Sequence, residues 1–511
     1  MRRPTLVLAT LAATAAAAVA TAPSVQAQED PAIETVILPS ESSPLVVVQL
    51  MLDVGSIHDP EGKEGLAALT ALMVGDAGTS ERSYAELIDA LYPMAASISP
   101  GTDREVTVLA GRIHRDTLAD YTDLLVEAVT SPGFRESDFE RNRSRLEAYL
   151  TSTLRSANDE LLGLEAIQGA IFRGHPYAHP PAGTVEGLAA ITLDDVKKFY
   201  RENYTSANLL LGVAGGFPAG YPEALAGRLA ALPAGEEGRL PLPAPPAPDG
   251  RRYTLIEKDA GAVGIHFGYP LPVNRSDPAY YPLMVANSYL GEHRTFHGRL
   301  MQQLRGERGL NYGDYSYVEH WYNPPFTSNP TPGVPRRQQY FSVWIRPVRP
   351  ETTHFALRAA LHEVDRLRER GMTQEELDLA RDFLVSYSKL WAQTLTDRLG
   401  FHLDSRFYGM PYYIDEIERR LAEVTVEDVR AAVREHLSTE RYEAVLITDD
   451  AAALAEALRG GEPSPMSYES EVPAEVLAAD EVIERRPVEP TAVEIVPVGE
   501  VFEDTPVLGG E

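Results

Sequence analysis

The chain has 511 residues, with 75 acidic and 46 basic side chains, 12 histidines and no cysteine, and its formal charge is −29. A nucleic-acid-binding surface must neutralise phosphates, so this excess of acid argues against a nucleic-acid partner. The absence of cysteine excludes disulfides, thiolate metal sites and a cysteine nucleophile. A hydrophobic fraction of 44% in a chain too long for one core predicts two or more globular domains.

The first 27 residues have the pattern of an export signal. Arg2 and Arg3 precede an Ala-rich apolar run over residues 6–22, and residues 25–27 (VQA) offer a small-residue cleavage site. A membrane anchor is the alternative interpretation, but the run is short and weakly hydrophobic, and no second span follows. We therefore expect residues 1–27 to be removed and the mature chain to be periplasmic or secreted, without a membrane span.

A Pro-rich stretch over residues 232–250 (LPAGEEGRLPLPAPPAPDG) has no hydrophobic periodicity and predicts an extended linker. It separates an N-terminal half, residues 28–231, from a C-terminal half, residues 251–460. Two glycines then begin an acidic, Pro-rich tail over residues 461–511. Because the tail also holds apolar pieces, it either lies along the body or binds a partner.

The two halves repeat the same order of patterns. A helix expected to begin at Thr192 recurs 233 residues later at Thr425, and each is followed by a strand-like run. Ser137 and Thr373, 236 residues apart, each stand three residues before a glutamate, which fits a capping box at a helix start. Two pairs at nearly one offset indicate a duplicated unit of about 200 residues.

Strand-like and helix-like segments are mixed within each half. In the first half the strand patterns cover residues 35–38, 45–54 and 106–113, and the helical spacing covers residues 65–74, 84–92, 116–129 and 137–154. Hairpin-like strands mixed with helices predict an α+β fold, with two similar halves that each pack helices on antiparallel sheet.

Several motifs stand in an order typical of one peptidase family. They are a strand–loop–helix unit over residues 50–83, the turn GHPY (174–177) with GT at 183–184, a helix-then-strand close over 191–215, and the segment RLMQQLRGERGLNY (299–312). This ordered set, over roughly residues 31–450, resembles the insulinase/pitrilysin family of zinc peptidases, which includes mitochondrial processing peptidase. The resemblance implies a fold of two similar halves, like that of mitochondrial processing peptidase.

The same resemblance implies that the catalytic element is lost. The family carries an inverted zinc motif, H-x-x-E-H, on its first helix, and the motif glutamate acts as general base on the zinc-bound water. Those positions are Ala68, Ala71 and Leu72 here, and none of them can bind a metal or move a proton. Glu147 aligns with the family's distal ligand, but one carboxylate cannot hold zinc, and an exposed helix glutamate explains it equally well. We expect no metal or other cofactor on this chain.

Two histidine pairs offer an alternative zinc site. His293 and His297 stand four residues apart, with Glu292 adjacent, and His175 and His179 have the same spacing. Prolines interrupt any helix at the second pair, and neither pair has a third ligand at a helpful spacing. Both patterns favour structural roles, and an active enzyme with displaced ligands is the minor alternative.

Arg305 and Tyr312 match an Arg and a Tyr that the family uses to bind substrate and stabilise the oxyanion. The resemblance implies that role here, since guanidinium and phenol donate to a carbonyl oxygen as it gains charge. The alternative is an arginine paired with a nearby carboxylate and a half-buried tyrosine on a strand over residues 312–318. Aromatic residues follow as candidates for a peptide-binding wall or for sheet packing: Tyr315, Tyr317, Trp321 and Tyr322.

The sequence thus predicts the non-catalytic subunit of an exported heterodimeric zinc metallopeptidase, which is expected to be inactive alone and active only with a zinc-bearing partner. A homologous subunit would bear the zinc, and Arg305 and Tyr312 would contact the peptide substrate. Such cavities bind peptide as an added strand, for which residues 46–52 and 106–110 are the candidate edges. The alternative function is a catalytically dead peptide-binding or scaffold protein.

Overall fold

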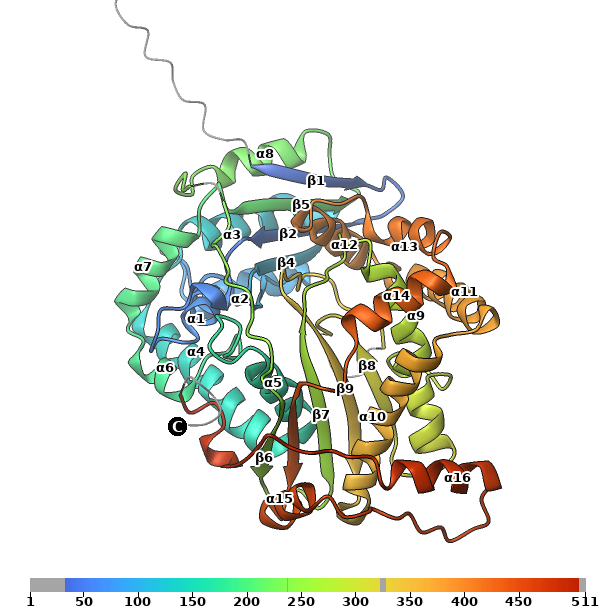
Figure 1. Cartoon of the computed structure of the whole chain (residues 1–511). Coiled ribbons are helices and arrows are strands. Elements are labelled where there is room, and N and C mark those ends of the chain that lie inside the picture. The colour runs from blue at the N-terminus through green and yellow to red at the C-terminus, as the bar shows by residue number, and fades with distance from the viewer. Residues whose placement is uncertain (1–32, 237, 322–327, 505–511) are drawn as a thin grey trace, which may run out of the picture.

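The computed structural model describes residues 33–236, 238–321 and 328–504 (Figure 1). The predicted export signal, residues 1–27, lies outside this part of the chain. Across the described ranges, no helix combines the length and the apolar character that a membrane span requires. Residues 232–250, leaving out residue 237, form no helix or strand.

Two sheets organise the described residues. The first has the strand order β1-β5-β2-β4-β3, with bounds β1 Glu34–Pro39, β2 Leu45–Leu52, β3 Ser99–Thr102, β4 Thr107–His114 and β5 Leu209–Gly215. The second has the order β11-β6-β10-β7-β9-β8, with bounds β6 Arg251–Glu257, β7 Val263–Leu271, β8 Asp314–Tyr317, β9 Gln339–Val348, β10 Tyr442–Thr448 and β11 Ala492–Pro497.

The second sheet repeats the first strand for strand and adds β11 at one edge. The predicted α+β fold with two similar halves is therefore confirmed. The sheets are mixed rather than purely antiparallel, because β1 pairs in parallel with β5, and β6 pairs in parallel with both β10 and β11. Helices lie between β1 and β5 in the chain, as parallel neighbours require.

Helices cover both sheets. Those of the first half are α1 Leu66–Gly75, α2 Tyr84–Leu91, α3 Leu118–Thr130, α4 Glu136–Ala148 with a π-helical continuation over Tyr149–Ala157, α5 Asp159–Ile171, α6 Val185–Ala190, α7 Leu193–Asn203 and α8 Tyr221–Leu229. Those that follow are α9 Tyr280–Gly291, a π-helical turn over Met301–Gly306, α10 Thr353–Arg370, α11 Gln374–Trp391, α12 Leu395–Phe407, α13 Tyr413–Leu421, α14 Val426–His436, α15 Ala451–Gly460 and α16 Ala474–Ile483.

Capping explains three of the predicted helix starts and corrects a fourth. Thr192, Thr373 and Thr425 each accept a hydrogen bond from the third helical residue, whose carboxylate accepts one back from the cap. The capping box predicted at Ser137 is wrong, because α4 begins at Glu136 and its extended cap residue is Arg135. Ser137 therefore lies inside the first turn, where its hydroxyl is not needed as a cap.

One helix of each half packs on the sheet of the other half. Helix α5 of the first half packs on β7 and β10, and helix α12 of the second half packs on β2 and β5. A Cβ at Gly163 of α5 would lie 2.1 Å from the buried His266 ring, so only glycine permits this approach. The apolar contact of α12 with the first sheet is a cluster of Val47, Met51, Val106, Ala214, Leu399, Leu403 and Phe407.

The described part of the C-terminal tail, up to residue 504, lies along the body and reaches the first half (Figure 1). Strand β11 adds to the second sheet, and the chain then crosses so that Val501 and Phe502 enter the first half's core. The Arg155 guanidinium holds this crossing, donating to the Val501 carbonyl at 2.7 Å and to the Glu503 carboxylate at 2.7 Å. The tail therefore joins the two halves at a point remote from the linker in sequence.

We expect Phe502→Ala to lower the free energy of unfolding by about 3–5 kcal/mol, because it leaves a cavity in the first half's core. Leu477→Ala, at an exposed position of α16 in the same tail, should change it by less than about 0.5 kcal/mol. Urea unfolding of the full chain measures both. Equal stability of Phe502→Ala and the wild type would show that the tail is not part of this core.

Candidate functional site

A cavity of about 510 Å³ lies between the two halves. The first half supplies one face of α1 and the edge strand β3. The second half supplies residues 331–334, which precede β9, and Gly400 on α12. Both halves must therefore be in place for this cavity to exist.

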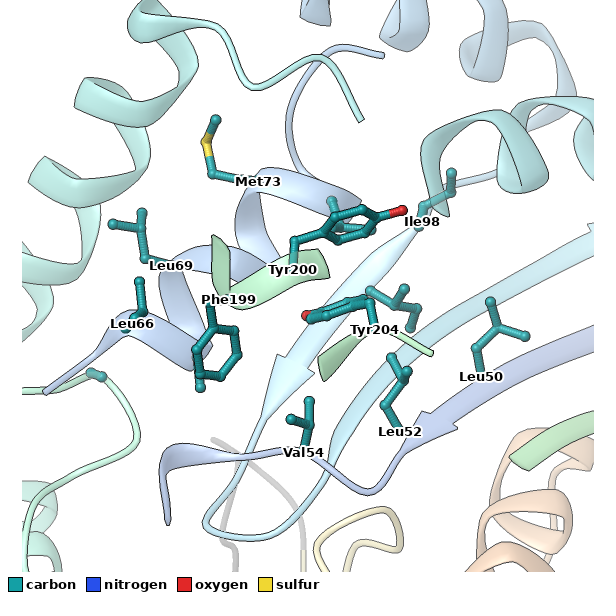
Figure 2. Packing of buried hydrophobic residues seen from close by; sticks show 14 of the residues in the cluster. Leu50, Leu52, Val54, Leu66, Leu69, Met73, Ile98, Phe199, Tyr200 and Tyr204 are labelled. Atoms are coloured by element: carbon teal, nitrogen blue, oxygen red, sulfur yellow. The ribbon is translucent and has the colours of Figure 1, made fainter. Parts of the chain in front are cut away.

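Helix α1 is fixed by a carboxylate and by its apolar face. Asp59 accepts hydrogen bonds from the backbone N–H groups of Gly65 and Ala67, at 2.8 and 2.7 Å, which satisfies the helix start. Figure 2 shows Leu66, Leu69 and Met73 of α1 packed in the core with side chains of α7. The opposite face of α1 lines the cavity.

That cavity face consists of Ala68, Ala71 and Leu72, the positions at which the family motif would place its zinc ligands and base. Their side chains offer no nitrogen or oxygen to a metal ion. Glu147 is exposed and is absent from the cavity wall, although its neighbours Leu146 and Tyr149 line it. Within residues 33–236, 238–321 and 328–504, no three His, Asp or Glu side chains come together as a metal site. The residues present do not fit zinc.

The two histidine pairs do not form an alternative site. Helix α9 ends at Gly291, so His293 and His297 do not share a helix face. His293 is buried with its Nδ1 2.7 Å from the Tyr317 hydroxyl, whereas His297 is exposed. The rings of the other pair face backbone carbonyls: His175 lies 3.1 Å from that of Pro243 in the linker, and His179 lies 3.0 Å from that of Pro180. These contacts are structural.

A buried ion pair joins the halves at the cavity wall. The Arg336 guanidinium, 1% exposed, donates to both oxygens of Asp103 at 2.8 and 2.7 Å and to Gln168 of α5 at 2.7 Å. Burial alone would raise the pKa of Asp103, but the Arg336 charge outweighs it and holds that pKa at about 2. Next to it, Arg104 pairs with Glu165 of α5 at 3.1 Å.

The edge strand at this cavity is β3, not either of the strands predicted. Residues 46–52 belong to β2, which lies between β5 and β4, and residues 106–110 belong largely to β4, which lies between β2 and β3. Residues 99–102 of β3 line the cavity, and no described strand pairs with their outer side. No strand was predicted over residues 99–102, whose sequence SPGT contains residues typical of turns, although proline within a strand also marks an edge.

Arg305 and Tyr312 lie together on the surface of the second half. The Arg305 guanidinium carbon is 4.9 Å from the centre of the Tyr312 ring, and that of Arg346 is 5.1 Å from it. Arg346 in turn pairs with Glu160 of α5 at 2.6 Å. Tyr312 is 68% exposed, and neither member of the predicted pair lines the cavity. The substrate-binding role of the pair stays a prediction.

The neighbouring aromatic residues pack rather than form an open wall. Strand β8 spans Asp314–Tyr317, so Tyr312 precedes the strand instead of beginning it. The rings of Tyr315, Tyr317 and Trp321 surround His293, with centroid distances of 5.0, 5.9 and 4.9 Å. Tyr322 lies outside the described residues.

Comparison with known families agrees with this geometry. The profile of the insulinase family, peptidase family M16, matches residues 35–185, and the profile of the peptidase M16 inactive domain matches residues 190–384. Together these matches cover more than half of the chain, so the chain belongs to peptidase family M16. The resemblance predicted from the motifs is confirmed. With apolar residues at the zinc motif, the chain is an inactive M16 homologue.

Some of its relatives are named as proteases, and another is named as a non-peptidase homologue. An uncharacterized zinc protease of Streptomyces coelicolor is 25% identical over 371 residues, covering 70% of this chain and 76% of that protein. The non-peptidase homolog YmxG of Helicobacter pylori is 23% identical over 396 residues, covering 75% and 84%. The periplasmic protease PqqL of Escherichia coli shares the fold, with a TM-score of 0.65 and 16% identity, over 89% of this chain and 49% of PqqL.

We expect Arg336→Met to lower the free energy of unfolding by roughly 3–5 kcal/mol, because it leaves the buried Asp103 carboxylate with Arg104, 3.9 Å away, as its remaining ion-pair partner. The double variant Asp103→Leu with Arg336→Met should recover most of that loss, since neither charge of this pair remains buried. Urea unfolding measures the cycle. A double variant no more stable than Arg336→Met would contradict this account of the pair.

The same pair predicts an acid limb in the stability profile. Because the folded pKa of Asp103 is about 2, below the ordinary value of 3.8, its contribution is present above about pH 4 and is lost as the pH falls toward 2. Asp103→Asn should flatten this limb and leave the profile near neutral pH unchanged in shape.

Proposed function

We propose that this chain is the non-catalytic subunit of an exported heterodimeric metallopeptidase. The proposal is supported by a difference between the zinc-motif face of α1 and the surface that holds Arg305 and Tyr312. The face of α1 that the family uses for zinc is apolar here, while Arg305 and Tyr312 are retained and held at the surface, off the chain's own cavity. A substrate-binding pair that faces outward is suited to a site on another polypeptide.

Hydrolysis requires an activated water and a base, and neither can be supplied by Ala68, Ala71 or Leu72. Zinc and the base are therefore assigned to a homologous partner subunit with an intact H-x-x-E-H helix. This chain would provide the second wall of the chamber. Its large excess of acid agrees with a protein that avoids nucleic acid and anionic lipid surfaces.

Tyr312 is preorganised for the role proposed. The guanidinium groups of Arg305 and Arg346 both lie near its ring, and the pairing of Arg346 with Glu160 fixes one of these neighbours. A fixed phenol and a fixed guanidinium lose little freedom when they donate to a peptide carbonyl oxygen. The donors would bind the substrate backbone and stabilise the oxyanion formed at the partner's zinc.

The length of PqqL supports a second unit of this kind. Because the matched region is 89% of this chain but only 49% of PqqL, that protease has room for two such units in one polypeptide. In the proposal, two separate chains provide what one longer chain provides there.

The alternative function is a catalytically dead peptide-binding or scaffold protein. The free edge of β3 and the cavity beside it favour this alternative, since an extended peptide can pair with an exposed strand edge without any hydrolysis. The two functions differ in whether a zinc-bearing partner gains activity from this chain.

We expect peptidase activity from a mixture of this chain with the zinc-bearing partner, and none from this chain alone. Arg305→Ala or Tyr312→Phe in this chain should lower kcat/KM of the mixture about 10²–10³-fold, the usual effect of removing one oxyanion donor. Cleavage of an unfolded fluorogenic peptide is the measurement.

Two exposed positions provide matched controls for that assay. Arg349→Ala and Tyr92→Phe change an exposed arginine and an exposed tyrosine outside the proposed contact, and should leave kcat/KM unchanged. If Arg305→Ala and Tyr312→Phe are as active as these controls, the scaffold function is the correct one. Stoichiometric zinc with hydrolysis by this chain alone would overturn both.

Export has its own test. We expect the mature protein to begin at Gln28, because residues 25–27 fit a signal-peptidase site. Intact-mass spectrometry of the protein recovered from the periplasm or the medium measures this. Recovery of the uncleaved chain in the membrane fraction would favour the anchor interpretation.

A further inference from the structure

A second, smaller cavity of about 30 Å³ lies within the C-terminal half. Four aromatic rings and two carboxylates stand on its wall: Tyr280, Tyr317, Trp321, Trp391, Glu292 and Glu319. It shares no lining residue with the large cavity, yet both flank the chain segment between β8 and β9. His320 faces the large cavity, and Glu319 and Trp321 on either side of it face the small one.

Glu292 is buried at this cavity without a cation. It is 6% exposed, and among the described residues its side chain forms no ion pair with Arg, Lys or His. Residues 322–327 (YNPPFT), which follow Trp321 directly in the chain, contain no basic residue. Burial raises the pKa of Glu292 to about 7, against a hydrogen bond from the His293 backbone N–H, and the nearby Glu319 charge adds to the rise. A buried carboxylate of this kind lacks its counter-charge.

The other acids nearby do not leave a cation free for Glu292. Arg275 donates to both oxygens of Glu319, at 2.9 and 3.3 Å, and is also 3.4 Å from Asp404. Two carboxyl groups therefore already share this guanidinium, and Glu292 forms no ion pair with it. A further positive group in the small cavity would balance this charge.

We propose that this cavity binds the ammonium group of a lysine side chain from a peptide. The faces of aromatic rings attract cations, and a carboxylate among them provides a charge-assisted hydrogen bond. A volume near 30 Å³ corresponds to about one water molecule, which suits an ammonium group and is too small for a trimethylammonium group. The proposal does not depend on the function proposed above, because it requires neither zinc nor a partner subunit.

Tryptophan fluorescence reports on this cavity directly. The chain has three tryptophans; Trp321 and Trp391 line the cavity, and Trp344 stacks on His293 beside it with a centroid distance of 6.4 Å. We expect Nα-acetyl-lysine amide, titrated into the full mature chain, to change the emission in a saturable way. Nα-acetyl-norleucine amide, which keeps the alkyl stem without the charge, should have no such effect. Methylammonium chloride, compared with sodium chloride at equal ionic strength, should bind more weakly than the lysine amide because it lacks the stem.

Substitution of Glu292 is the decisive arm. Glu292→Gln keeps the shape of the side chain and removes its charge, so the affinity for Nα-acetyl-lysine amide should fall about tenfold or more. Glu351→Gln, at an exposed glutamate outside the cavity, should bind like the wild type. Circular dichroism and thermal unfolding establish that both variants are folded. A lysine amide signal that never saturates, an equal response to the norleucine amide, or an unchanged affinity in Glu292→Gln would each overturn the proposal.

Discussion

The bond between Asp103 and Arg336 is the interaction on which the arrangement of the halves depends. It joins the β3–β4 turn of one half to the segment before β9 of the other, and both residues lie on the wall of the central cavity. Because a charge buried without its partner is strongly unfavourable, the two segments must stay together once the chain has folded. The interaction that joins the two halves therefore also holds the two sides of the cavity together.

The chain keeps the helix position that carries the family's zinc motif but lacks the side chains that bind zinc. Helix α1 keeps its capped start and its packed inner face, so Ala68, Ala71 and Leu72 still point into the cavity. Replacing ligands by small apolar residues on the cavity face removes metal binding without disturbing the core beneath. Stability and catalysis are thus carried by opposite faces of one helix, which is why one can be lost and the other retained.

Much of the fold followed from local patterns. The strands near residues 35–38, 45–54 and 106–113, the threonine caps and the repeat offset are local or periodic signals, and the structure contains them. Strand β3 was missed because Pro100 and Gly101 are typical of a turn. The ion pair of Arg336 and the docking of Phe502 connect residues hundreds of positions apart, and no pattern along the chain marks such contacts. The place of Arg305 and Tyr312 outside the cavity also depended on tertiary packing.

Helices α5 and α12 each pack on the sheet of the other half, and this has a consequence for how such a chain arose. A single copy of the repeated unit would leave one face of its sheet bare, since the helix that covers that face belongs to the other copy. An ancestral half-length protein would have needed to form a homodimer, in which a helix of each protomer covered the sheet of the other. Fusion of the two genes would place both copies in one polypeptide, after which either copy could diverge.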